Sequence, residues 1–132
     1  MAKKRTYSTG PHREKAILVG VSVRSKGDYW ALEDSLAELS ELARAAGANP
    51  IDRFTQTMNK PSPTYLGKGK IDELQHMVKH TEVDTVIFDD ELSPTQQKSL
   101  EDKLGAKVID RTALILDVFA QRARSREGRL QV

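Results

Sequence analysis

The stretch that decides the fold of this chain covers residues 85–132, TVIFDDELSPTQQKSLEDKLGAKVIDRTALILDVFAQRARSREGRLQV. Twice in it, an apolar run of strand length ends in an acid and is followed by a helix start. The first run ends at Phe88, and the segment 93–96, Ser-Pro-Thr-Gln, then predicts a capped helix that ends at Gly105. The second run, residues 107–109, leads into a helix that Asp110 or Thr112 caps and that continues to about Arg124 or beyond.

The same order of strand and helix continues upstream of this stretch. Residues 16–21 form a continuous apolar run, which is typical of a strand covered on both faces, and residues 29–46 carry leucines and alanines at helical spacing. Residues 51–58 alternate and predict an edge strand, before a loop over 59–70 and a helix over about 70–80. Four such repeats predict an α/β fold: a four-stranded parallel sheet, in the order 2-1-3-4, with helices on both faces.

This strand order predicts where a ligand cleft lies. The order changes direction between the first and third strands, and clefts open at the carboxyl ends of the strands at such a point. We therefore expect residues 23–28 and 89–93 at the rim of the cleft. An independent nucleotide-binding or receiver-like domain using this cleft is one interpretation of the fold.

Two groups of residues raise the question of a metal ion. Asp89, Asp90 and Glu91 follow the third strand, where clustered carboxylates either hold Mg²⁺ or favour the start of the next helix; we expect the structural role. His76 and His80 are spaced as zinc ligands on a helix, but they fall opposite its apolar residues and no third ligand is evident. We expect no metal site in this chain.

Composition places the chain among ordinary globular domains. Its 132 residues are 38% hydrophobic and 30% charged, and they include no cysteine, which excludes disulfides and thiolate metal sites. No apolar run approaches the roughly 20 residues of a membrane span. The first residues are charged and lack the apolar segment of a secretory signal, so we expect a cytoplasmic protein.

Positive charge gathers at the two ends of the chain, although the net charge is only +2. Residues 1–14, expected to be a basic flexible tail, are rich in lysine and arginine. Near the other end lie Arg122, Arg124, Arg126 and Arg129, and the sequence between the ends is acidic. Basic ends on an acidic body indicate either nucleic-acid contact or solubilising segments. For the arginines we favour contact with RNA phosphates.

A glycine-rich loop supplies the other candidate phosphate contacts. Gly67, Lys68, Gly69 and Lys70 open onto a predicted helix, where ammonium groups and backbone N–H donors can hold phosphate. The phosphate-loop pattern of nucleotide-binding proteins fails, because Ile71 stands where it requires serine or threonine. A glycine-enabled turn with solvated lysines is the alternative.

The last helix is apolar around most of its circumference, from Leu114 to Phe119. Such a helix needs covering on two sides, and the sheet supplies only one. The second cover is a segment absent from this chain or a second copy of it, which makes a dimer of the chain possible; local overpacking at the sheet edge is the alternative.

Three segments resemble the N-terminal domain of the HflX family of ribosome-associated GTPases: residues 65–70, 88–94 and 109–128. The resemblance implies an α/β N-terminal domain over 15–125 and the truncated start of a helical arm over 126–132. It implies a protein that binds the large ribosomal subunit and its rRNA and helps to split or rescue ribosomes. GTP and Mg²⁺ are then cofactors of a GTPase domain outside this chain, because the chain itself carries no GTPase motif. The resemblance also implies that the N-terminal domain contacts the helical arm and the GTPase domain, or regulates the GTPase.

Overall fold

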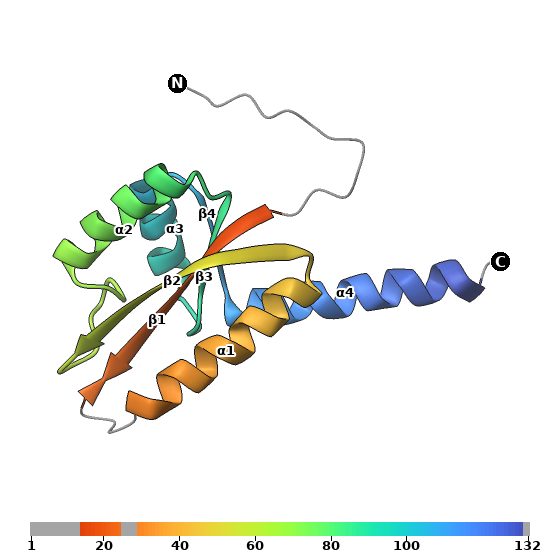
Figure 1. Cartoon of the computed structure of the whole chain (residues 1–132), viewed down its shortest axis with the longest axis horizontal. Coiled ribbons are helices and arrows are strands. Elements are labelled where there is room, and N and C mark those ends of the chain that lie inside the picture. Colours follow the sequence, from red (N-terminus) through yellow and green to blue (C-terminus); the bar gives the residue numbers. More distant parts are fainter. Residues whose placement is uncertain (1–13, 25–28, 131–132) are drawn as a thin grey trace.

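Strands and helices alternate along the chain in the computed structural model, which describes residues 14–24 and 29–130, without the side chains of 29, 30 and 125–130. Figure 1 shows the arrangement, with the helices in layers on either side of the sheet. The elements are β1 (Glu14–Val23), α1 (Tyr29–Ala45), β2 (Ala48–Met58), α2 (Lys68–Thr81), β3 (Thr85–Phe88), α3 (Pro94–Leu104), β4 (Lys107–Asp110) and α4 (Arg111–Leu130). The predicted tail lies outside the described residues, apart from Glu14, which begins β1.

The sheet confirms the predicted topology. Its strands are all parallel and follow the order β2-β1-β3-β4. β1 pairs with β2 along its whole length, from Glu14 to Val23, but it pairs with β3 only from Ala16 to Val19. The sheet is therefore four strands wide at one end and two strands wide where β1 and β2 end.

Alternating residues of the two central strands build a core on each face of the sheet. Ile17, Val19, Val86 and Phe88 pack in one cluster with residues of α2 and α3. Leu18 and its neighbours pack in the other cluster with residues of α1 and α4, such as Leu36 and Leu114. Both faces are thus covered, as the continuous apolar runs predict.

The starts of β2 and α2 lie earlier in the chain than the sequence predicts. β2 begins at Ala48 and includes Pro50, where the register shifts because Ala16 faces Pro50 and Ile17 already faces Asp52. A proline without an N–H group is tolerated in an edge strand at such a bulge. α2 begins at Lys68, two residues before the prediction, and its cap Gly67 makes no side-chain hydrogen bond, so no sequence signal marks this start.

The helix starts in the second half of the chain follow the sequence signals. Ser93 Oγ accepts the Gln96 N–H at 3.1 Å, and Gln96 Oε1 accepts the Ser93 N–H at 2.9 Å, which completes the predicted cap of α3. Asp110 Oδ1 accepts the Ala113 N–H at 3.0 Å and so caps α4. Its other oxygen accepts the Leu92 N–H at 3.0 Å, which ties the start of α4 to the loop after β3.

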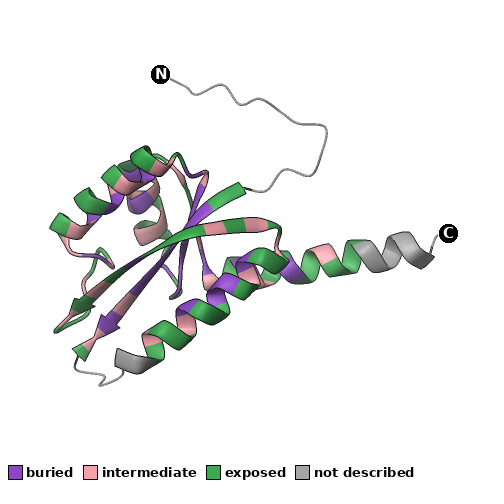
Figure 2. Ribbon diagram, in the orientation of Figure 1, coloured by how far each residue is buried: buried purple, intermediate pink, exposed green. Residues whose placement is uncertain are grey.

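The helix α4 packs on the body through its first half and then projects away from it (Figure 1). Leu114 and Val118 are buried, whereas Leu116 and Phe119 are 63% and 61% exposed. Figure 2 shows that α4 becomes mostly exposed where it leaves the body. The helix therefore carries more apolar side chains than the sheet can cover, as the sequence predicts. No described residue covers its outer face. Within this part of the chain, no helix combines the length and the apolar character needed to cross a membrane.

Candidate functional site

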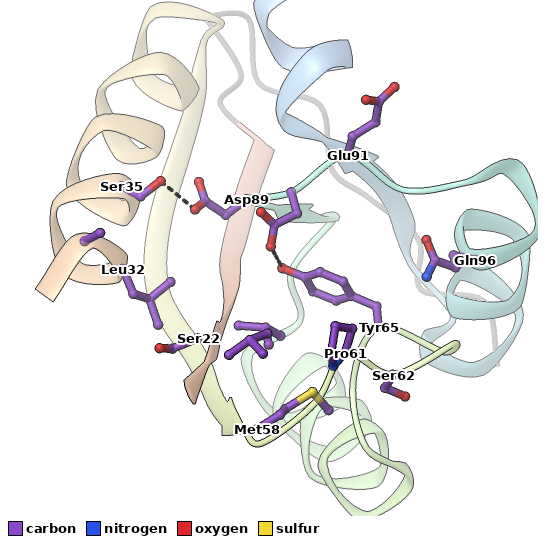
Figure 3. A pocket seen from close by; sticks show the side chains of 14 residues that line it. Ser22, Leu32, Ser35, Met58, Pro61, Ser62, Tyr65, Asp89, Glu91 and Gln96 are labelled. Atoms are coloured by element: carbon purple, nitrogen blue, oxygen red, sulfur yellow. Dashed lines mark hydrogen bonds between the residues drawn. The ribbon is translucent and has the colours of Figure 1, made fainter. Parts of the chain in front are cut away.

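A cleft of about 430 Å³ opens at the carboxyl ends of β1 and β3, where the strand order predicts it. α1 forms one wall, and the loop before α2 forms the other (Figure 3). Of the residues predicted at the rim, Val23, Asp89, Asp90 and Glu91 line the cleft, Leu92 and Ser93 do not, and residues 25–28 lie outside the described part. Leu32, Met58 and Pro61 add apolar surface.

Tyr65 fixes the loop that forms one wall of the cleft. Its hydroxyl donates a 2.6 Å hydrogen bond to Asp90 Oδ2, and its ring meets Phe88 edge-on, with the centroids 5.4 Å apart. Burial and the Asp90 carboxylate raise the pKa of Tyr65 well above its usual range, so the hydroxyl stays protonated and remains a donor. The backbone of Tyr65 has a φ of 70°, an uncommon conformation for a side chain of this size.

Asp89 lines the cleft and is held by Arg111. The Arg111 Nη2 lies 2.7 Å from Asp89 Oδ1, and Nη1 lies 2.6 Å from Glu38 Oε1. Ser35 donates its hydroxyl to Asp89 Oδ2 at 2.6 Å and accepts from Arg111 with its carbonyl. Burial alone lowers the pKa of Arg111, but the Asp89 and Glu38 carboxylates outweigh burial and raise it. This network joins α1, β3 and α4.

Two of the three acids after β3 have structural partners in the fold, but these partners are not the N-terminus of the next helix, which the sequence predicted. Asp89 binds Arg111 and Asp90 binds Tyr65, while Ser93 and Gln96 satisfy the start of α3. No group of three or more potential metal ligands occurs among the described residues. His76 and His80 are exposed on α2, as predicted.

The loop candidates Gly67, Lys68, Gly69 and Lys70 lie at the start of α2, outside the cleft lining. The Gly67 N–H donates to Gln56 Oε1 at 2.9 Å, so this donor is not free to bind a phosphate. Lys70 Nζ lies 3.5 Å from Glu73 Oε2 and 5.7 Å from the centroid of the Phe54 ring. Lys68 is exposed and has no ion pair among the described residues, which leaves it as the more available cation of the two.

The arginine candidates lie on the projecting half of α4. Arg122 and Arg124 are exposed and make no ion pair within the described part of the chain. Arg126 and Arg129 belong to the same helix, but their side chains lie outside the described residues. Since α2 and α4 cover opposite faces of the sheet, the structure does not bring the lysines and the arginines together into one surface.

Sequence reasoning assigned no role to Arg111 and Tyr65. A signal for Arg111 exists in the register: Phe88 faces Asp110, so the residues that follow them, Asp89 and Arg111, meet at the same sheet edge. An acid and an arginine at the ends of neighbouring parallel strands therefore indicate an ion pair. No comparable signal exists for Tyr65, because its position depends on the path of a loop.

Comparisons with known proteins agree with this architecture. A family model described as "GTP-binding GTPase N-terminal" matches residues 33–120. A protein named GTPase HflX from Alkalihalophilus pseudofirmus is 49% identical over 120 residues, which are 90% of this chain and 28% of the relative. The GTPase HflX of Escherichia coli is 43% identical, over 90% of this chain and 27% of the relative. The chain thus spans under a third of the length of the curated relatives that it matches.

A solved structure shares the fold. A GTP-binding protein from the archaeon Sulfolobus solfataricus, in complex with GDP, superposes with a TM-score of 0.58 at 20% identity, over 80% of this chain and 30% of that one. The class that emerges is a parallel α/β domain found in larger GTP-binding proteins. Within that class, the chain belongs to the GTP-binding GTPase N-terminal family and is a member of the HflX GTPase family.

Proposed function

We propose that this domain binds ribosomal RNA of the large ribosomal subunit, as part of a larger cytoplasmic GTPase that splits or rescues ribosomes. The observation that carries the proposal is the state of Arg122 and Arg124, which are exposed on the projecting half of α4 without an ion pair in the described part of the chain. Arginines left unpaired on a helix that stands clear of the body can reach phosphates without losing an internal contact.

The proposed phosphate contacts divide into a main group and an auxiliary one. The main group is Arg122 and Arg124, together with Arg126 and Arg129 further along α4. Lys68 is the auxiliary contact, and Lys70 contributes less because Glu73 already neutralises it. Gly67 is the N-cap of α2 next to Lys68, and Gly69 lies in the first turn of this helix. In this proposal, GTP and Mg²⁺ bind to a separate domain of the larger protein. Residues 1–132 pack against that domain and in this way regulate GTP turnover.

The test is binding of the 132-residue chain to purified large subunits at rising salt. We expect Arg122→Ala with Arg124→Ala to weaken binding and to reduce the log–log salt slope by roughly 1.4–1.8, since each lost phosphate contact removes roughly 0.7–0.9. Lys79→Ala with Lys98→Ala is the matched control, because it removes two exposed charges from α2 and α3 on the other face. Equal losses for both pairs would mean that only net charge matters.

A second test separates the lysines from the arginines. Lys68→Ala should reduce the slope by no more than roughly 0.9, and Lys70→Ala should change it less, because its ammonium is paired with Glu73. If Lys68→Ala and Lys70→Ala change neither the affinity nor the salt slope, the lysines are not phosphate contacts. That result would leave the proposal for the arginines unchanged.

A further inference from the structure

The helix α4 leaves the body of the domain at Gln121. Leu114 and Val118 are buried beneath the helix, and Gln121 continues their stripe at the spacing i, i+4, i+7 as a half-buried residue. The next three residues, 122–124, are all exposed (Figure 2). Gln121 is therefore the last half-buried residue of α4 in the described part of the chain, and the arginine candidates begin directly after it.

Gln121 contacts the end of α1 through a hydrogen bond. Its Nε2 donates to the carbonyl oxygen of Ala46 at 2.9 Å. Ala46 follows the last residue of α1, and the chain turns away at Gly47, where φ is 91°. Carbonyl groups at the end of a helix lack a partner inside it and carry partial negative charge, so they accept well from an amide N–H. The bond thus satisfies the end of α1 and holds α4 beside it.

The packing around this bond is open. A hollow of about 360 Å³ lies between the end of α1 and α4, and Ala46, Gly47, Leu114 and Asp117 are among the residues that line it. Dispersion contacts need atoms on both sides, and the hollow removes them from this part of α4. Packing therefore resists a tilt of the helix less here than a filled core would, and the hydrogen bond carries more of the restraint.

Two fixed points determine the direction of a straight helix. The first is Arg111 at the start of α4, whose guanidinium reaches Glu38 and Asp89. The second is Gln121, which lies ten residues and roughly 15 Å further along the axis. The buried apolar residues of α4 lie between these points, so Gln121 is the anchor nearest to the arginines.

We propose that Gln121 is a positioning residue for RNA binding. Its bond to the end of α1 sets the direction of the projecting half of α4, and so presents Arg122 and Arg124 to phosphates in one arrangement. This inference rests on the proposed function of those arginines. The apparent affinity rises with the fraction of molecules that already have the competent arrangement. Gln121 is uncharged, so it raises the affinity without adding to the salt dependence.

Spin labels test the direction of α4 without any ribosome present. The chain contains no cysteine, so Asp34→Cys on α1 and Ala123→Cys on α4 accept labels at these two exposed positions alone. Pulsed electron resonance then gives the distribution of distances between the labels. Gln121→Met keeps the length of the side chain but removes the N–H donor, and we expect it to broaden this distribution because α4 then tilts.

Binding to purified large subunits tests the consequence for RNA. Gln121→Met, in the 132-residue chain without labels, should weaken binding at least about threefold and leave the salt slope unchanged, because it removes an internal hydrogen bond and no phosphate contact. Gln97→Met is the matched control: Gln97 Nε2 donates to the Val108 carbonyl oxygen at 3.0 Å, from α3 to β4. Both variants should lower the urea midpoint by similar amounts, but Gln97→Met should change neither the distances nor the affinity.

An unchanged distance distribution, an unchanged affinity or a reduced salt slope in Gln121→Met overturns the inference, and so does an equal loss of affinity in Gln97→Met. The proposed function fails separately, if Arg122→Ala with Arg124→Ala leaves the salt slope unchanged. The label distances still report on the anchor in that case, so the two failures are distinguishable.

Discussion

The side chain of Arg111 connects several elements of the fold. Its guanidinium reaches Glu38 and Ser35 on α1 and Asp89 at the end of β3, while its own backbone begins α4. Arginine suits this position because its planar fork donates in several directions at once. The sequence contained the pair, but the register of the strands was needed to show that Asp89 and Arg111 meet.

Replacing Arg111 with Met should destabilise the domain by about 3 kcal/mol, because it leaves the buried Asp89 carboxylate without its counter-charge. Urea unfolding measures this change. Adding Asp89→Asn should restore about half of the loss, since the uncompensated charge is then removed as well. The control is Arg44→Met: its pair with Glu41 is exposed, and its loss should cost at most about 1 kcal/mol. Similar costs for both arginines would contradict the assigned role.

Among the elements, those with side-chain caps and continuous apolar runs could be predicted from sequence, and those set by contacts between elements could not. The cap of α3 was predictable because Ser93, Pro94 and Gln96 carry the signal locally. The start of α2 was not, because Gly67 is held by Gln56 from β2 instead of by a cap of its own. The cleft could be located from strand order, but its Tyr65 wall could not.

The contact between β1 and α1 depends on Gly20. A Cβ atom there would lie 2.7 Å from Leu32 Cδ1 and 3.2 Å from Leu36 Cδ2. Leu32 is half-buried and can yield, but Leu36 is fully buried, so Gly20→Ala should lower the free energy of unfolding by about 1 kcal/mol in urea unfolding.

The matched control for Gly20→Ala is Gly69→Ala. Nothing lies within 4 Å of a Cβ atom at Gly69, which is a residue of α2. Alanine is the better helix former, so this change should be neutral or stabilising by up to about 1 kcal/mol. A stabilising effect at both glycines would show that α1 does not approach β1 as closely as described.

At the scale of the whole molecule, the sheet keeps the two groups of candidate phosphate contacts apart. Sequence analysis could list Lys68, Lys70 and the α4 arginines, but it could not show that α2 and α4 cover opposite faces. Only one group at a time can face a flat RNA surface.

The other large-scale feature is the apolar outer face of α4, next to the arginines. That another part of the larger protein or a second copy of the chain covers this face stays a prediction.

Leu116→Gln with Phe119→Gln should change the free energy of unfolding by less than about 0.5 kcal/mol, because both side chains are mostly exposed. Val118→Ala, on the buried side of the same helix, should cost about 1–3 kcal/mol. Sedimentation at rising concentration then asks whether the exposed pair drives self-association: a dimer that the double variant abolishes identifies this face as its interface, and a monomer at all concentrations excludes the dimer.

The unequal strand lengths have a consequence for motion. From Gly20 to Val23, β1 has β2 as its only strand neighbour among the described residues, since the pairing with β3 ends at Val19. A two-stranded ribbon is marginally stable alone, so the amide protons of this segment should exchange with solvent sooner than those of Ile17 and Leu18. The cleft is thus built on the part of the sheet that opens most easily, which lets its two walls adapt to an occupant while the four-stranded end keeps the fold intact.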